Sequence, residues 1–199
     1  MNEKRFLGAV FSLQLLGGRA VVKDVAARTG CDIREADSIA TRLELKGLLR
    51  KDGSEVFLTE KGRRAIKVVF IGGGFEIIHP GHIYTVDQAK GLGDVLVAVV
   101  ARDSTIRRRK GREPVAGEAD RVGLLSSLRQ VDAAILGVEG DIYRTLQKVG
   151  PDVVALGYDQ HHAESEILSE AARRGMHLRV VRLDTHHPRI KTTRLLREI

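Results

Sequence analysis

Two histidines three residues apart are the most chemically informative feature of the sequence. His79 and His82 flank Pro80 and Gly81, shortly after the apolar run 68–71 and three glycines. This order predicts a strand, a glycine turn and the start of a helix. Free backbone N–H groups and the positive end of a helix dipole favour phosphate at such a junction. We therefore predict a nucleoside triphosphate site, where both imidazoles can donate hydrogen bonds.

The elements that would position these histidines follow a regular pattern. From Lys67 onward, short β-type runs alternate with helical stretches; the runs are Val68–Ile71, Val95–Ala101, Ala133–Leu136, Val153–Leu156 and Leu178–Leu183. Such alternation is typical of a parallel sheet with helices on both faces. We therefore predict an α/β, Rossmann-like domain over residues 67–199, with ligands bound beyond the carboxyl ends of the strands.

Residues 1–66 predict a smaller domain that resembles a winged helix-turn-helix. Apolar spacing indicates three helices, and Asp52-Gly53 indicates a tight hairpin before a closing helix. Charges on the third helix are balanced: Arg34, Arg42 and Lys46 against Glu35, Asp37 and Glu44. A DNA-binding helix needs a positive excess. The favoured interpretation is therefore a dimerisation or packing module, and DNA binding is the less favoured alternative.

Composition sets the outer limits of function. The 199 residues carry a formal net charge of +7, and 43% of them are hydrophobic, enough for ordinary globular cores. The charge favours anionic partners. The single cysteine, Cys31, excludes an intramolecular disulfide and a multi-thiolate zinc site. We expect no membrane span and a cytoplasmic location, because no long apolar run or signal-peptide pattern is present.

The His79-Pro80-Gly81-His82 motif, after a glycine-rich strand end, resembles the signature of the cytidylyltransferase-like nucleotidyltransferase superfamily. Further segments agree with that family in their order: Ala-Arg-Asp-Ser-Thr at 101–105, Lys-Gly-Arg at 110–112, Asp-Arg at 120–121, Leu-Gly-Tyr-Asp-Gln at 156–160 and Ile-Lys-Thr-Thr-Arg at 190–194. Several ordered motifs at predicted strand ends are far more specific than one tetrapeptide. The segments at 101–105 and 157–160 are most similar to archaeal FAD synthases.

The resemblance implies nucleotidyl transfer, in which a phosphate of the acceptor attacks the α-phosphorus of a triphosphate and pyrophosphate leaves. It implies catalytic roles for His79, His82, Lys110, Arg121 and Thr193, and nucleotide contacts from Gly73, Gly74, Phe75, His79, Pro80, Gly81, His82, Arg102, Asp159, Thr192 and Thr193. Acceptor contacts are expected from Glu76 and Tyr158. Mg²⁺ is expected to bind mainly through phosphate oxygens, with no dedicated protein metal site.

Two histidine pairs follow the fourth and fifth predicted strands, on the same sheet edge as His79. We hypothesise that His161 and His186, one from each pair, line the acceptor pocket; the alternative, slightly favoured, is that they are exposed loop residues.

Two positions depart from the family pattern. Gly74 and Glu76 stand where the family usually has Thr and Asp.

FAD synthesis from ATP and FMN is the leading functional prediction. One alternative is a CTP-dependent cytidylyltransferase that acts on glycerol phosphate, phosphoethanolamine or inositol phosphate. Another, of a different class, is a winged-helix transcriptional regulator that senses a nucleotide or a flavin without turnover. A homodimer is expected, because the resemblance implies pairing and the winged helix would supply a further interface.

Overall fold

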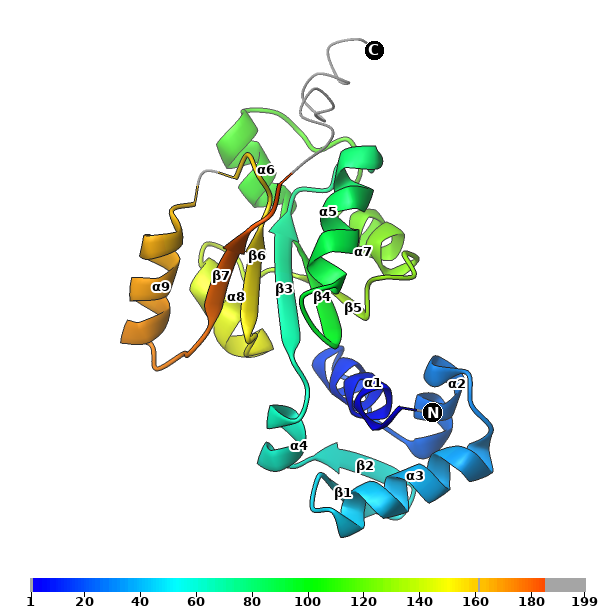
Figure 1. Ribbon diagram of the computed structural model, residues 1–199. Helices are drawn as coiled ribbons and strands as arrows, with labels where there is room; N and C mark the ends of the chain where they lie inside the picture. Colours follow the sequence, from blue (N-terminus) through cyan, green and yellow to red (C-terminus); the bar gives the residue numbers. More distant parts are fainter. Residues whose placement is uncertain (1, 161, 185–199) are drawn as a thin grey trace. The chain divides into compact units, whose positions relative to one another are not determined.

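The computed structural model describes residues 2–160 and 162–184. The chain divides after Lys67 into two compact units, and each is described by itself. Figure 1 shows an N-terminal unit of helices with a two-stranded hairpin, and a C-terminal unit built on a parallel sheet.

The N-terminal unit begins with α1 (Glu3–Leu15), α2 (Val22–Thr29) and α3 (Ile33–Leu45). A hairpin of β1 (Leu49–Asp52) and β2 (Glu55–Leu58) follows, then α4 (Glu60–Arg64). Side-chain caps mark where the helices begin: Asp32 accepts a hydrogen bond from the Arg34 N–H, and Thr59 accepts one from the Gly62 N–H. Gly53 supplies the positive φ, +58°, that the hairpin turn needs.

Buried apolar residues hold the N-terminal unit together, and some of its surface charges pair with one another. Phe6, Leu43 and Val56 are fully buried. Near the end of α3, Lys46 donates a hydrogen bond of 2.8 Å to Glu3. Arg42 donates to the same carboxylate at 3.1 Å. These two cations of α3 are therefore partly neutralised within the unit.

The C-terminal unit confirms the predicted α/β architecture. Its elements are β3 (Val68–Gly73), α5 (Pro80–Lys90), β4 (Val95–Val100), α6 (Asp103–Lys110), α7 (Glu118–Ser126), β5 (Ala133–Leu136), α8 (Ile142–Val149), β6 (Val153–Leu156), α9 (Glu164–Arg173) and β7 (Arg179–Arg182). Within the described residues, these five strands form one sheet in the order β5-β4-β3-β6-β7, and every neighbouring pair is parallel.

The strand order explains where a ligand can bind. The chain moves outward from β3 to β4 and β5, then returns across the sheet to β6 and β7. Right-handed crossovers therefore place α5 and α7 on one face and α8 and α9 on the other. Figure 1 shows α5 in front of β3 and β4. The order reverses between β3 and β6, and open α/β sheets usually bind ligands beyond the carboxyl ends of such strands; we call this position the crevice.

The sheet itself is the hydrophobic core. All six residues of β4 are buried, as expected for a central parallel strand covered on both faces. One core cluster joins Val69 and Ile71 of β3 to Val86 of α5 and Leu125 of α7. No helix in the described part of the chain is long and apolar enough to cross a membrane.

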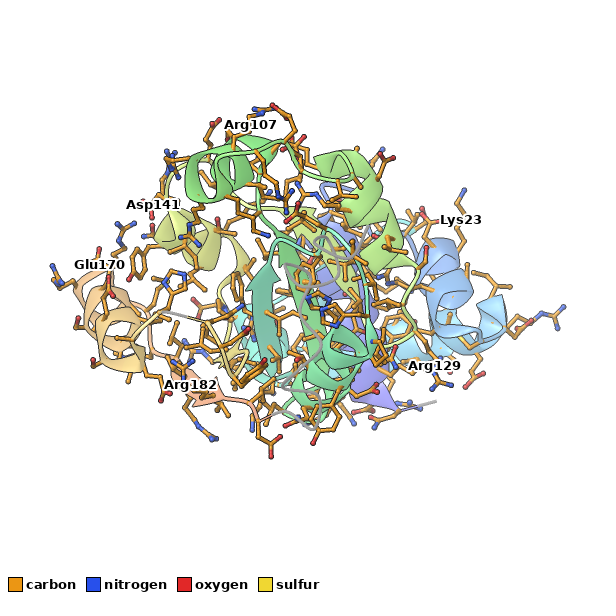
Figure 2. The ribbon with its side chains drawn as sticks, turned by 90° about the horizontal axis from the view of Figure 1, so that it is seen from above. Lys23, Arg107, Arg129, Asp141, Glu170 and Arg182 are labelled. Carbon is orange, nitrogen blue, oxygen red and sulfur yellow. The ribbon has the colours of Figure 1, made fainter. Side chains whose placement is uncertain are left out.

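The side chain of Arg174 joins α8 and α9. Arg174 donates hydrogen bonds to Glu170 at 2.7 Å and to Asp141 at 3.1 Å, and its guanidinium lies 5.1 Å from the centre of the Tyr143 ring. Figure 2 shows the two carboxylates on the same side of the sheet. These contacts of Arg174 stabilise the unit and lie outside the predicted site.

Candidate active site

The site is built where the backbone leaves β3. Gly73 ends the strand, and the following turn leads into α5, whose first residue is Pro80. Phe75, in the turn, has a left-handed φ of +50°, the one non-glycine residue of the described chain with a positive φ. Bulky residues rarely adopt this conformation, and such strain gathers at functional sites. A side chain at Gly73 would place its Cβ 2.9 Å from the Phe75 ring, so the ring would have to shift to admit it.

The two predicted histidines stack at the start of α5. Their ring centroids are 3.9 Å apart with an interplanar angle of 26°, and the Phe75 ring lies 5.4 Å from the His82 ring. His79 is the N-cap residue in an extended conformation, and Pro80 takes a first helical position, where no N–H is needed. The two imidazoles therefore lie side by side at the predicted start of the helix.

His82 is held in its neutral form. Burial, and after it the nearby His79, lower its pKa to about 4, against smaller opposing effects of a backbone hydrogen bond with Ile77 and of the Asp159 charge. Its Nδ1 atom is buried and has no hydrogen-bond partner among the described residues. Buried polar atoms are normally hydrogen-bonded, so an unpaired one beside a helix N-terminus indicates a ligand position.

Cations gather on the β4 side of the histidines. Lys110, at the end of α6, forms an ion pair with Glu76. Arg112 donates to the same carboxylate at 2.7 Å. The Glu76 side chain is fully buried, whereas each cation keeps 37% of its side chain exposed. The Glu76 carboxylate faces the two cations, and its contact with the acceptor stays a prediction.

Arg121 is enclosed by protein partners. Its side chain is only 1% exposed and donates to Asp103 and to the Gly74 carbonyl, both at 2.6 Å, and to the Ala116 carbonyl at 3.0 Å. Arg121 therefore fixes the glycine turn to the start of α6, and its catalytic role stays a prediction.

Arg102 lies at the end of β4, where the sequence placed it, but its guanidinium is largely engaged. It donates to the Gly137 carbonyl at 2.9 Å and to Glu118 at 2.8 Å. Glu118 also accepts a hydrogen bond of 3.0 Å from the Asp103 N–H. The segment after β4 is therefore held to α7 by charged hydrogen bonds, which sequence analysis missed because the partners lie far apart along the chain.

The loop after β6 forms the other side of the crevice. Asp159 is exposed, and its charge acts on His82, which places it near the histidine pair. Gln160 donates at 2.6 Å to the carbonyl of Gly72 in β3, and Gly157 donates back to its Oε1 at 3.3 Å. Gln160 therefore joins the two strands that border the crevice. Tyr158, between Gly157 and Asp159, is partly exposed.

Arg182, at the end of β7, supports this loop from its outer side. It donates to the carbonyls of Gly157, Gln160 and His162 at distances of 2.8 to 3.2 Å. Figure 2 shows Arg182 on the β7 ribbon, with Arg107 of α6 on another side of the sheet. An arginine at the carboxyl end of a strand was the sequence signal for this role.

Some predicted site residues lie outside the described part of the chain. They are His161, His186, Thr192 and Thr193. Among the described residues, an open hollow of about 520 Å³ borders His79 and is lined mainly by Ile78, Pro80, Ile83 and Tyr84. The described ranges contain no group of three or more His, Cys, Asp or Glu side chains arranged to hold a metal ion.

The depressed pKa of His82 predicts a pH-dependent stability. As pH falls from about 6.5 to about 4, the unfolded histidine takes up a proton before the folded one does, so the free energy of unfolding decreases. The full window corresponds to about 3 kcal/mol. Urea unfolding should show that the free energy of unfolding decreases less from pH 7 to pH 4.5 in His82→Gln than in the wild type. Equal decreases in both proteins would contradict the lowered pKa of His82.

Replacing Arg121 tests its buried pairing. Arg121→Met leaves Asp103 and the Gly74 carbonyl without their partner, and should lower the free energy of unfolding by about 3 kcal/mol. The matched control is Arg129→Met, at an exposed position labelled in Figure 2, for which a change within about 0.5 kcal/mol is expected. Urea denaturation measures both. An Arg121→Met protein as stable as the control would refute the role.

Comparisons with known proteins agree with this geometry. Curated proteins named FAD synthase match the chain: one from Archaeoglobus profundus is 46% identical over 111 residues, 56% of this chain and 70% of that protein. One from Thermoplasma volcanium is 42% identical over 130 residues, 65% of this chain and 91% of that protein. One from Thermococcus onnurineus is 38% identical over 145 residues, 71% and 96% of the two chains.

Solved structures show the same relationship. A crystal structure described as the lipopolysaccharide core biosynthesis protein from Thermoplasma volcanium is 44% identical, with a TM-score of 0.59 over 61% of this chain and 98% of that one. A protein of unknown function from Archaeoglobus fulgidus, 20% identical with a TM-score of 0.51 over 63% of this chain and 94% of that one, shares the fold. The family model described as "Cytidylyltransferase-like" matches residues 70–198. The chain therefore belongs to the cytidylyltransferase-like family of nucleotidyltransferases.

Proposed function

We infer that this protein is an FAD synthase, which transfers AMP from ATP to FMN and releases pyrophosphate. The observation that carries the inference is the identity of 38% to 46% to FAD synthases, over 70% to 96% of their lengths. The CTP-dependent alternative is not favoured, because these relatives are named FAD synthase. The stacked histidines at the start of α5 supply the chemistry that such a reaction needs.

The arrangement suits an in-line displacement. A phosphate oxygen of FMN attacks the α-phosphorus of ATP, the bond to the bridging oxygen breaks, and pyrophosphate leaves with the electron pair. No covalent enzyme intermediate is required, so positioning and charge neutralisation carry the rate. Neutral His82, whose N–H is engaged with the backbone at Ile77, brings no second positive charge beside His79.

The remaining roles follow from the geometry of the crevice. We propose that Lys110 and Arg112 face the phosphates from the β4 side, while Tyr158 and Asp159 face the nucleotide from the β6 side. Thr192 and Thr193 are proposed as phosphate contacts on the resemblance alone. The apolar hollow beside His79 gives the organic part of a substrate a surface close to the reacting centre.

We propose that Mg²⁺ accompanies ATP and is held mainly by its phosphate oxygens. When bound, the ion neutralises part of the charge on the triphosphate. The donor set fits this assignment: near the histidines, Glu76 and Asp103 are engaged by cations rather than grouped as carboxylate ligands.

The N-terminal unit is proposed to be a winged-helix module that serves in packing or homodimerisation. Its order of helices and hairpin supports the fold, and the pairing of Arg42 and Lys46 with Glu3 reduces the positive face that DNA would require. A gel shift at low salt should show no retention of genomic fragments, and analytical ultracentrifugation should show a dimer. Retention that weakens steeply with added salt would favour DNA binding instead.

Turnover measurements test the enzymatic assignment. Pyrophosphate release should be measured with Mg²⁺, crossing ATP and CTP against FMN, glycerol phosphate and phosphoethanolamine. We expect release with ATP and FMN together, with FAD identified by chromatography. His79→Ala should lower kcat by about 10²- to 10³-fold, because it removes a donor to the developing charge.

His177→Ala is the matched control, since this exposed histidine precedes β7 at the opposite edge of the sheet. It should leave turnover unchanged. Turnover with CTP and a small phosphate would favour the cytidylyltransferase alternative. Nucleotide binding without turnover in any combination would favour the sensor.

A further inference from the structure

The buried Glu76 carboxylate is the feature that the proposed reaction does not yet use. It accepts hydrogen bonds from Arg112 Nη1 at 2.7 Å and from the Val115 N–H at 3.3 Å, and it also pairs with Lys110. These partners lie 34 to 39 residues further along the chain. One carboxylate thus holds the last residue of α6 and two groups of the segment that follows it.

The three charged side chains differ in their exposure to solvent, and this difference shows which of them face outward. The Glu76 side chain is 0% exposed, and both cations are 37% exposed. The carboxylate therefore lies behind the cations, and the cations present their remaining surface outward. An anion that approaches from solvent meets Lys110 and Arg112 while Glu76 holds them from within.

The turn that carries Glu76 is itself fixed. The left-handed backbone at Phe75 accompanies a side chain that packs beside His82, and the next side chain pairs with the cations. Arg121 holds the same turn through the Gly74 carbonyl. The position of the two cations relative to the histidine pair is thus set by one rigid turn.

The charge state of Glu76 matches this role. Burial alone would raise the pKa of its carboxyl, but hydrogen bonds and charges from Arg112 and Lys110 outweigh that effect, so the pKa lies below its ordinary value. Lys110 also acts electrostatically on His82. The cluster is therefore ionised at neutral pH and electrostatically linked to the histidine pair.

We propose that Glu76 is a positioning residue, whose buried carboxylate holds Lys110 and Arg112 at the distance from His82 that nucleotidyl transfer requires. The proposal deepens the proposed function and rests on it. Glu76 touches neither substrate. It acts through two cations that would otherwise move freely on long side chains, since lysine and arginine lose much rotamer freedom when they are fixed.

A double-mutant cycle tests the proposal. Glu76→Gln and Arg112→Gln should each lower kcat/KM for ATP, at saturating FMN, by about 10²-fold, as expected for misplaced catalytic groups. The double variant should lose far less than the product of the two effects, because both changes break one unit. The proposal would be overturned if the two losses of kcat/KM multiplied in the double variant, or if Glu76→Gln had the activity of the wild type.

Two further variants separate positioning from general stability. Glu76→Asp keeps the negative charge and should regain at least about tenfold of the activity lost in Glu76→Gln; an Asp variant no better than Gln would contradict the role. Glu113→Gln is the matched control, because Glu113 lies in the same segment but pairs with Arg107 at the surface and is 73% exposed. Its activity should equal that of the wild type.

Binding measurements keep this proposal separate from the choice of acceptor. Calorimetry with the β,γ-methylene analogue of ATP and Mg²⁺ needs no FMN, so the same cycle can be run if FMN is not the substrate. Non-additive losses of affinity are expected here too, and additive ones would overturn the proposal. Urea unfolding checks that each variant is folded, and a cycle of Glu76→Asp with Lys110→Gln replaces the first if Glu76→Gln does not fold.

Discussion

The way in which the backbone leaves β3 is the constraint on which the rest of the site depends. The strand ends in Gly73, the chain turns through a left-handed residue at Phe75, and a helix begins with Pro80. Only a short turn separates the end of the strand from the histidines. Because this turn is compact, it brings the Phe75 ring, the buried Glu76 carboxylate and the N-terminus of α5 close together.

A second constraint is charge. Phosphate chemistry requires cations, yet cations on long side chains are poorly placed unless something holds them. The protein holds its cations in two ways. Arg121 is buried and holds backbone, whereas Lys110 and Arg112 stay partly exposed and are held by a buried carboxylate. The first arrangement stabilises the turn, and the second leaves charge available at the crevice.

The two sides of the crevice differ in character. The β4 side supplies cations, and the β6 side supplies a loop tied by Gln160 and Arg182 to neighbouring strands. Such a division suits a substrate with a charged and an uncharged part. The N-terminal unit lies outside the residues that the family model matches, so its role has to be sought in its own surface.

Much of the C-terminal fold could be predicted from sequence, because strand and helix periods and turn residues are local signals. The runs at 133–136 and 153–156 were predicted with the bounds that the structure has, and His79 and His82 lie at the predicted helix start. The glycine-rich strand end and Pro80 identified the junction. These features depend on neighbours a few residues away, which the sequence displays directly.

Side-chain partners were decided by tertiary structure alone. Sequence shows the type of a residue but not its burial, so it did not indicate that the Arg121 and Glu76 side chains are buried against charged partners. Their partners lie up to 47 residues away for Arg121, and Gln160 reaches across 88 residues to Gly72. Only the crossovers of the sheet bring such residues together, and burial then determines which charges meet one another and which remain open to a ligand.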